Sequence, residues 1–175
     1  VSGVAVADAN SAWVTARSSS GGRMVLTVIK VTPSGVASSF GTQGVARVPV
    51  AGKDVTAHDI AVLPSGKVLL AGEARPSATS STADTLLARL GPNGASDPAF
   101  GSGGIAIHNL SGGTGEDYAA ALAPLADGGF VTAGPAAGVG AVARFGSAGA
   151  PDPDFGDGGK VIGGLMPAGS GYAPA

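Results

Sequence analysis

The sequence repeats three times, and this repetition is the feature that most limits how the chain can fold. A Phe-Gly pair opens a glycine-rich loop at residues 40–44, again at 100–104 and again at 155–159. The phenylalanines therefore recur every 55 to 60 residues. A fixed period of roughly this size is typical of repeat architectures, in which one supersecondary unit cannot bury its apolar surface alone.

Two further anchors recur in the same order around each loop. One is a turn followed by an apolar run, at residues 65–72 and 127–134, with a weaker copy at 10–17. The other is an apolar run with a cation near its end, which falls at Lys30, Arg89 and Arg144. Because these cations recur, we expect them to pair with the backbone or with loop carboxylates, as part of the scaffold.

Each repeat predicts four short β-strands. In the middle repeat they cover residues 58–63, 67–73, 85–90 and 105–110, which are rich in Val, Leu and Ile and bounded by Gly, Pro, Asn and Asp. The third of these runs is apolar at nearly every position, so both faces of its sheet are expected to be buried. Helical periodicity is absent and Gly is frequent, which together indicate an all-β fold.

A four-stranded antiparallel sheet with two apolar faces has to stack against its neighbours, and radial stacking builds a β-propeller. We therefore predict one β-propeller-type domain over residues 1–166, with three four-stranded blades at roughly 1–50, 51–110 and 111–166. Residues 167–175 are expected to form a tail or linker stub.

Three blades do not close a ring, because propellers typically need four to eight. We expect a half-ring that is completed by self-association as a homo-oligomer or by a heteromeric partner across the exposed blade faces. An open stack and excision from a longer repeat array are the other possibilities.

The quoted anchors resemble the bacterial delta-60 repeat, a propeller-like unit of mostly unknown function. The resemblance rests on residues 87–94, 97–104 and 127–134 and covers nearly the whole chain as three copies. The first copy is weaker, with Ala37 where the other two have aspartate. The resemblance implies a β-propeller, often on a surface or secreted bacterial protein, and it supplies no catalytic residues. We therefore expect an extracellular or cell-surface location.

Composition excludes several classes of function. Ten Lys and Arg against twelve Asp and Glu give a net charge of −2, far from the basic surface of a nucleic-acid binder. No run approaches 18 apolar residues, so no membrane span is expected. The absence of Cys excludes disulfides and thiolate ligands. The chain begins at Val1 with no Met and no basic segment, so we expect a processed or excised start without a signal peptide in these residues.

No catalytic set is expected, and no cofactor. His58 and Asp59 are adjacent, so on a strand they would point to opposite faces, and no Gly-x-Ser-x-Gly motif is present. Asp152, Asp154 and Asp157 form a weak alternative site for Ca²⁺, which takes six to eight oxygen ligands. Ordinary turn chemistry is the favoured reading of this segment, because the other repeats lack the full set of acids.

The repeats differ most in the loop between the second and third strands. In an up-and-down blade this loop shares a rim with the connection to the next blade, and variable loops on one face of a repeat protein mark its binding face. Residues 73–84 and 110–117 are therefore predicted to contact a partner. The alternative for residues 78–82, which are small and mostly polar, is a flexible loop with no binding role. The most informative residues of this rim are Arg75, His108, Glu116, Asp117 and Tyr118.

We expect a non-enzymatic structural or protein-interaction module of a bacterial surface or extracellular assembly, which binds through this rim. The alternative is a sugar-binding, lectin-like propeller assembled from identical subunits. Sugar binding would need exposed aromatic side chains, whereas the five Phe lie at or near the anchors. Trp13 aligns with Val68 and Phe130 on a strand, and these positions are expected to be core.

Overall fold

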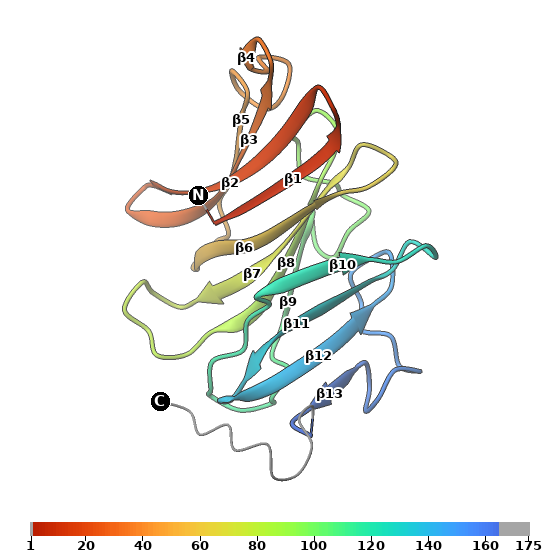
Figure 1. Cartoon of the computed structure of the whole chain (residues 1–175). Coiled ribbons are helices and arrows are strands. Elements are labelled where there is room, and N and C mark those ends of the chain that lie inside the picture. Colours follow the sequence, from red (N-terminus) through yellow and green to blue (C-terminus); the bar gives the residue numbers. More distant parts are fainter. Residues whose placement is uncertain (1, 165–175) are drawn as a thin grey trace.

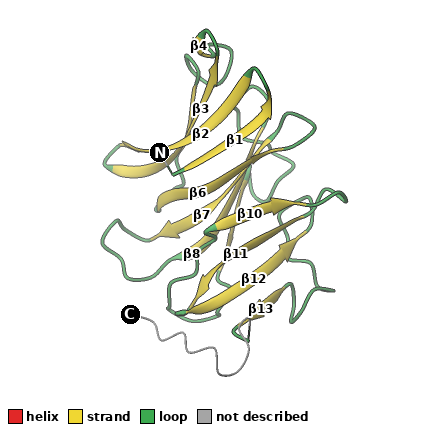
Figure 2. Ribbon diagram, viewed as in Figure 1, coloured by secondary structure: helices red, strands yellow, loops and turns green. Residues whose placement is uncertain are grey.

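The computed structural model describes residues 2–164, and in this range the only regular structure is β-strand (Figure 2). Thirteen strands form three antiparallel sheets that follow one another along the chain as a fan that does not close (Figure 1). None of these residues form a helix long and apolar enough to cross a membrane. The prediction of an all-β, propeller-type fold is confirmed.

The first sheet has five strands where four were predicted. They are β1 (Gly3–Asp8), β2 (Ser11–Ser20), β3 (Arg23–Thr32), β4 (Gly35–Val36) and β5 (Val45–Val48). The extra strand, β4, contributes only two residues, and both β4 and β5 pair with β3. Apart from this short addition, the sheet has the predicted order of four strands.

The other two sheets have four strands each, in sequence order. The second consists of β6 (Asp54–Val62), β7 (Val68–Arg75), β8 (Asp84–Leu90) and β9 (Ile105–His108). The third consists of β10 (Ala121–Pro124), β11 (Phe130–Ala136), β12 (Val139–Phe145) and β13 (Lys160–Ile162). The three sheets lie within residues 3–48, 54–108 and 121–162, and residues 165–175, which contain the predicted tail, lie outside the described part of the chain.

The second sheet is buried on both faces, as its continuous apolar run predicted. Successive side chains of a strand point to opposite faces. Those that pack against the first sheet are Val68, Leu70, Leu86, Ala88 and Leu90. Those that pack against the third sheet are Leu69, Ala71 and Leu87. The apolar run of β8 therefore fills two interfaces at once.

The first strands of the sheets are joined to one another by side-chain hydrogen bonds. Ser2 Oγ donates to the carbonyl of Ala57 at 2.6 Å, which joins the start of the first sheet to β6. The Leu122 N–H donates to Asp59 Oδ2 at 2.8 Å, which joins β10 to β6. These bonds hold β1, β6 and β10 along the same side of the fan (Figure 1).

The first two Phe-Gly loops each dock on a turn of the following sheet through a backbone hydrogen bond. The N–H of Gly41 donates to the carbonyl of Asn93 at 2.7 Å. At the next junction the N–H of Gly101 donates to the carbonyl of Ala148 at 2.9 Å. The repeated loop is therefore the connector between neighbouring sheets.

The phenylalanine of the loop packs on a glycine of the turn that it reaches. Phe40 lies against Gly94 and Phe100 against Gly149, and both rings are fully buried. Both glycines have positive φ, and a Cβ on Gly149 would lie 2.7 Å from the Phe100 ring. Phe155 is only partly buried, because no further sheet follows it within the described residues.

The register of β2 corrects one alignment made from the sequence. Trp13 pairs with Lys30 across the sheet, just as Leu69 pairs with the recurrent arginine of the second repeat. Trp13 therefore corresponds to Leu69, and its alignment with Val68 and Phe130 was wrong by one residue. A shift of one residue moves a side chain to the opposite face. The expected core role is confirmed, since Trp13 is buried between the first and second sheets.

Candidate functional site: a charged and aromatic cluster on the rim

Two of the predicted rim segments meet beside β6. Glu73 and Arg75 end β7, while Glu116 and Tyr118 lie in the segment that precedes β10. The register of β6 and β7 shifts between Ala57 and Asp59, so His58 sits in a β-bulge, where a side chain is re-aimed. The result is a group of five side chains, called the rim cluster below: His58, Glu73, Arg75, Glu116 and Tyr118.

Arg75 is the centre of the rim cluster. Its Nη2 lies 2.9 Å from Glu73 Oε2 and 2.6 Å from Glu116 Oε1, and its Nη1 donates to the carbonyl of Ser80 at 2.7 Å. The guanidinium is thus shared between β7, the β7–β8 loop and the segment before β10. Charge-assisted hydrogen bonds of this kind are stronger than neutral ones, so Arg75 holds two variable loops in place.

Both charges of the Glu73–Arg75 pair are stabilised by their neighbours. The His58 imidazole, with Nε2 3.7 Å from Glu73 Oε2, and the Arg75 guanidinium lower the pKa of Glu73 to about 2, against the opposing effect of burial. Glu73 and Glu116 in turn raise the pKa of Arg75. Glu73 is therefore ionised at neutral pH and is not a proton donor there.

An aromatic pair backs the charged groups. The rings of His58 and Tyr118 lie 5.3 Å apart at an angle of 54°. His58 Nε2 is buried and makes no hydrogen bond with residues 2–164. Glu116, by contrast, is 46% exposed in its side chain, so the cluster offers solvent a carboxylate and the edge of an aromatic pair.

Asp117 and His108 were predicted on the same rim, but the structure places neither in the rim cluster. Asp117 is fully buried, where Oδ2 accepts bonds from the N–H (2.8 Å) and hydroxyl (3.0 Å) of Ser111 and Oδ1 accepts one from the N–H of Ala137. His108 Nε2 lies 2.9 Å from the carbonyl of Gly149, and burial lowers its pKa. Asp117 thus anchors a loop, and His108 lies between the second and third sheets.

The three residues of the alternative calcium site take part in the turn, Asp152 through its carboxylate and Asp154 and Asp157 through their backbone N–H groups. Asp152 Oδ1 accepts a bond from the N–H of Asp154 at 3.1 Å, and its Oδ2 lies 3.1 Å from Nε of Arg144. The N–H of Asp157 donates to the carbonyl of Lys160. Within residues 2–164 no three His, Asp or Glu side chains come close enough to hold a metal ion. The contacts of these residues therefore support the interpretation of the segment as an ordinary turn.

Pairing with the backbone or with loop carboxylates was predicted for all three recurrent cations, and the side chains of two of them are paired in this way. Arg89 Nε lies 2.6 Å from Asp97 Oδ2, and both side chains are nearly buried. Lys67, 2.8 Å from the same oxygen, is the main group that lowers the pKa of Asp97 to about 2. Arg144 pairs with loop carboxylates, whereas Lys30 lies over the ring of Trp13. These cations belong to the scaffold.

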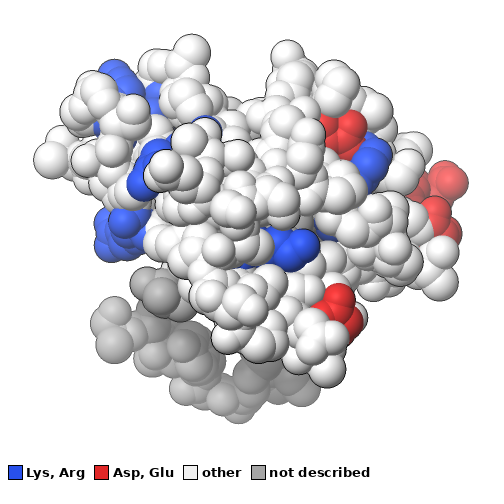
Figure 3. Space-filling model, turned by 90° about the horizontal axis from the view of Figure 1, so that it is seen from above, with Lys and Arg blue, Asp and Glu red and all other residues white. Residues whose placement is uncertain are grey.

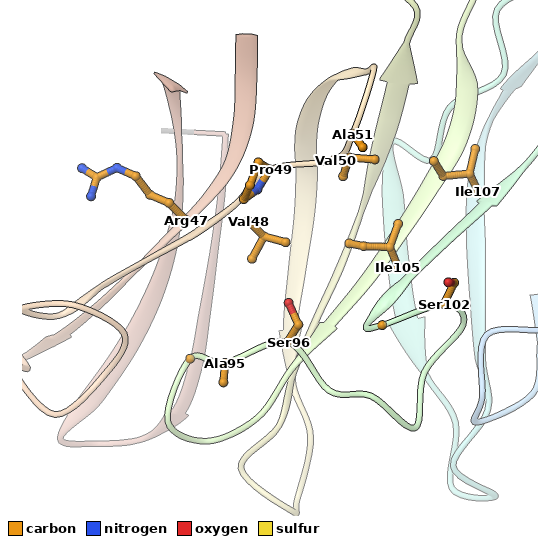
Figure 4. Close-up of a pocket in the computed structure, with 12 residues that line it drawn as sticks. Arg47, Val48, Pro49, Val50, Ala51, Ala95, Ser96, Ser102, Ile105 and Ile107 are labelled. Carbon is orange, nitrogen blue, oxygen red and sulfur yellow. The ribbon is translucent and has the colours of Figure 1, made fainter. Parts of the chain in front are cut away.

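A groove of about 680 Å³ that the sequence did not predict lies between the first and second sheets (Figure 4). Val48 and Val50 line it on one side and Ile105 and Ile107 on the other, with Arg47 directed away from it. A similar groove of about 570 Å³ lies at the next junction, lined in part by residues 105–108 and 148–151. Because the groove recurs, we attribute it to the way the sheets stack.

Charged side chains are sparse on the surface. The face of the molecule in Figure 3 shows them singly or in small groups on a mostly uncharged surface. This agrees with a charged fraction of 13%. The rim cluster is accordingly a concentrated charged feature on an otherwise weakly charged protein.

Comparison with known families supports a β-propeller-type domain. Residues 63–100 match the model of a family described as "Domain of unknown function (DUF5122) beta-propeller". The matched segment runs from the turn before β7 to Phe100, and so includes the apolar anchor, the recurrent arginine and the phenylalanine of the middle repeat. No curated protein matches the chain.

The fold and this match define a β-propeller module of unknown function, and the resemblance to a propeller-like repeat family of unknown function is confirmed.

Proposed function

We propose that this module is a non-enzymatic interaction module of a bacterial surface or extracellular assembly, and that it binds a protein partner through the rim cluster. The observation that carries the proposal is the position of Arg75 between Glu73 and Glu116. A side chain that is already held in one geometry loses little conformational entropy when a partner binds. Tyr and Arg are also the residue types that contribute most energy at protein interfaces.

The rim cluster differs from the scaffold because the other repeats do not carry it. By strand register, Arg17 and Pro135 occupy the position of Glu73 in the first and third sheets. A serine and an alanine follow at the position of Arg75. Features shared by all repeats are explained by stacking, whereas a group present once is a candidate for function.

Protein binding fits the cluster better than catalysis does. Glu73 is held ionised and Arg75 is already paired with two carboxylates, so neither is poised to transfer a proton near neutral pH. The five side chains include no Ser, Thr or Cys to act as a nucleophile. The bacterial surface location rests on the resemblance to the delta-60 repeat.

Sugar binding is the second candidate function, and one observation favours it. Tyr118 lies next to charged groups that could hydrogen-bond hydroxyls, the arrangement of an aromatic platform. Four of the five Phe side chains are buried, so they offer no such platform. A glycan array separates the two functions, because a lectin would bind defined sugars without any protein partner.

The partner experiment compares three forms of the chain on beads with an extract of bacterial envelope proteins. The wild type and an Arg17→Glu control should retain the same protein, and Arg75→Glu combined with Tyr118→Ala should lose it. The control reverses the charge of an exposed arginine on the first sheet, at the position that corresponds to Glu73. Direct titration of the purified partner then has to reproduce the difference. Equal retention by all three forms would overturn the proposal.

A further inference from the structure

The two junctions within the chain are built in the same way. At each, a buried phenylalanine packs on a positive-φ glycine of the next sheet, as Phe40 does on Gly94 and Phe100 on Gly149. The following loop glycine donates its N–H to a carbonyl of the same turn. Each junction therefore has a donor half, the Phe-Gly loop, and an acceptor half, the glycine turn.

The third sheet carries a donor half that has no acceptor within residues 2–164. The N–H of Phe155 donates to the carbonyl of Asp152 at 3.1 Å, as the N–H of Phe100 does to the carbonyl of Asp97. Gly156 has φ +58, and the corresponding glycines of the other two loops have φ +57 and +51. The loop thus has the docking conformation, yet Phe155 is only partly buried.

The first sheet carries an acceptor half that nothing in residues 2–164 fills. Gly35 follows Lys30 by five residues, just as Gly94 and Gly149 follow their arginines. Its φ is +107, and a Cβ built on it would meet no atom within 4 Å. By the same count from Lys30, the carbonyl of Ser34 corresponds to those of Asn93 and Ala148. This turn is one residue shorter, since the N–H that donates to the Lys30 carbonyl comes from Ala37, seven residues on, against eight in the other two sheets.

The outer face of the first sheet exposes side chains whose counterparts are covered. Val4 and Val6 of β1 are 62% and 68% exposed. By register they correspond to Ile60 and Val62 of β6, which pack in the interface between the first and second sheets. This face of β1 therefore matches one that a neighbouring sheet covers elsewhere in the chain.

The outer face of the third sheet shows the same contrast. Val161 is 38% exposed and pairs with the half-buried Val142. The corresponding pair in the second sheet is Ala106 and Leu87, both buried against the third sheet. Within residues 2–164, the first and third sheets thus expose two apolar faces that correspond to the two halves of the internal interface.

We propose that these two faces bind each other between two copies of the chain, with Phe155 of one copy packed on Gly35 of the other. The N–H of Gly156 then donates to the carbonyl of Ser34. Residues 2–164 of each copy carry one unfilled donor half and one unfilled acceptor half, so two such contacts between two copies of these three blades close a ring of six, within the range that propellers adopt.

The side chains around this contact fit it with one exception. Arg144 corresponds to Arg89, whose Nη1 donates to the carbonyl of Ser147 in the next sheet. Ala121 occupies the position of Asp59 in its sheet. The hydrogen bond that Asp59 accepts from the N–H of Leu122 at the second junction therefore has no counterpart in the proposed contact. The contact uses the end faces and leaves the rim cluster open, so it is separate from the proposed function.

Solution mass tests the proposal, measured by light scattering on the whole chain. The wild type should have a mass of about 33 kDa, twice the 16.5 kDa of one chain. Phe155→Ala and Gly35→Asn should each reduce it to about 16.5 kDa. Gly138→Asn is the matched control, since Gly138 has φ +83 and open space around it, and it should keep the wild-type mass. Unchanged circular dichroism shows that each variant is folded.

Mixing the two monomeric variants gives a second readout. Phe155→Ala keeps its acceptor half and Gly35→Asn keeps its donor half, so a mixture retains one intact contact and should regain dimers. A mass above 33 kDa that both variants reduce to one chain would also support the contact, as an open head-to-tail chain. A monomeric wild type, or a dimer that neither variant weakens, would overturn the proposal.

Discussion

Arg75 Nη2 lies 2.6 Å from Glu116 Oε1, and this ion pair joins the second sheet to the segment that leads into the third. The same nitrogen lies 2.9 Å from Glu73. One guanidinium therefore holds together the end of β7, the β7–β8 loop through Ser80, and the segment before β10. We expect the rim cluster to contribute to the stability of the protein as well as to the proposed binding.

Removing Arg75 should cost more stability than removing Glu116. Arg75→Ala leaves Glu73, a largely buried carboxylate, without its main cation, and we expect a loss of about 2 kcal/mol in the free energy of unfolding. Glu116→Ala removes a half-exposed partner and should cost about 0.5 kcal/mol. Urea denaturation of both variants and of the exposed control Arg17→Ala measures the difference. Equal losses would show that the Glu73–Arg75 pair does not carry the effect.

Acid should destabilise the protein partly through Glu73. Its pKa is about 2 in the folded chain, against an ordinary value of 4.5 for a glutamate, so the folded state favours the ionised form. The stabilisation is complete above pH about 4.5 and is lost as the pH falls toward 2. Glu73→Gln should flatten this part of the stability curve. The pKa of Asp97 is also about 2, so both carboxylates affect the stability of the wild type in this range. The urea midpoints of Glu73→Gln and the wild type are therefore compared at each pH, which isolates the contribution of Glu73.

Arg89 should matter more than Arg144, although the two occupy the same position in their repeats. The Arg89 and Asp97 side chains are 10% and 8% exposed, so Arg89→Leu removes a nearly buried charge-assisted hydrogen bond, leaves Lys67 as the remaining cation beside Asp97, and should cost about 2 kcal/mol. Arg144 is 36% exposed, and Arg144→Leu should cost about 1 kcal/mol or less. Thermal unfolding of the matched pair tests this, and a similar loss for both would contradict the burial argument.

Gly72 and Gly134 should not tolerate a side chain. A Cβ on either would lie 1.9 Å from a backbone carbonyl oxygen, that of Thr56 or of Tyr118. The backbone has to move to admit a methyl group, so each substitution by Ala should cost at least about 3 kcal/mol. Gly113→Ala is the control, with its nearest neighbour atom 3.9 Å away, and should change stability by less than about 0.5 kcal/mol. Soluble yield and denaturation report both outcomes.

Much of the scaffold could be predicted from local patterns. The apolar run of β8 anticipated burial on both faces of its sheet, and the recurrent arginines anticipated their ion pairs. The Phe-Gly loops marked the repeat, but the sequence did not predict their docking on the next sheet. The rim cluster was anticipated only in part. Arg75 and Glu116 do come together, and Glu73 lay in the predicted rim segment 73–84 without being singled out. His58 was missed, because the sequence did not reveal the β-bulge that re-aims its side chain.

The sequence by itself determined the number of sheets and which of them is covered on both faces, because these follow from the period of the repeat and the alternation of side chains along a strand. Only the tertiary structure decided that Glu116 is exposed while its neighbour Asp117 is buried, and that His108 contacts Gly149. Strand pairing joins segments close in sequence, and so leaves a local pattern. The partners of these three side chains come from other sheets and loops, and no local pattern records where two sheets will meet.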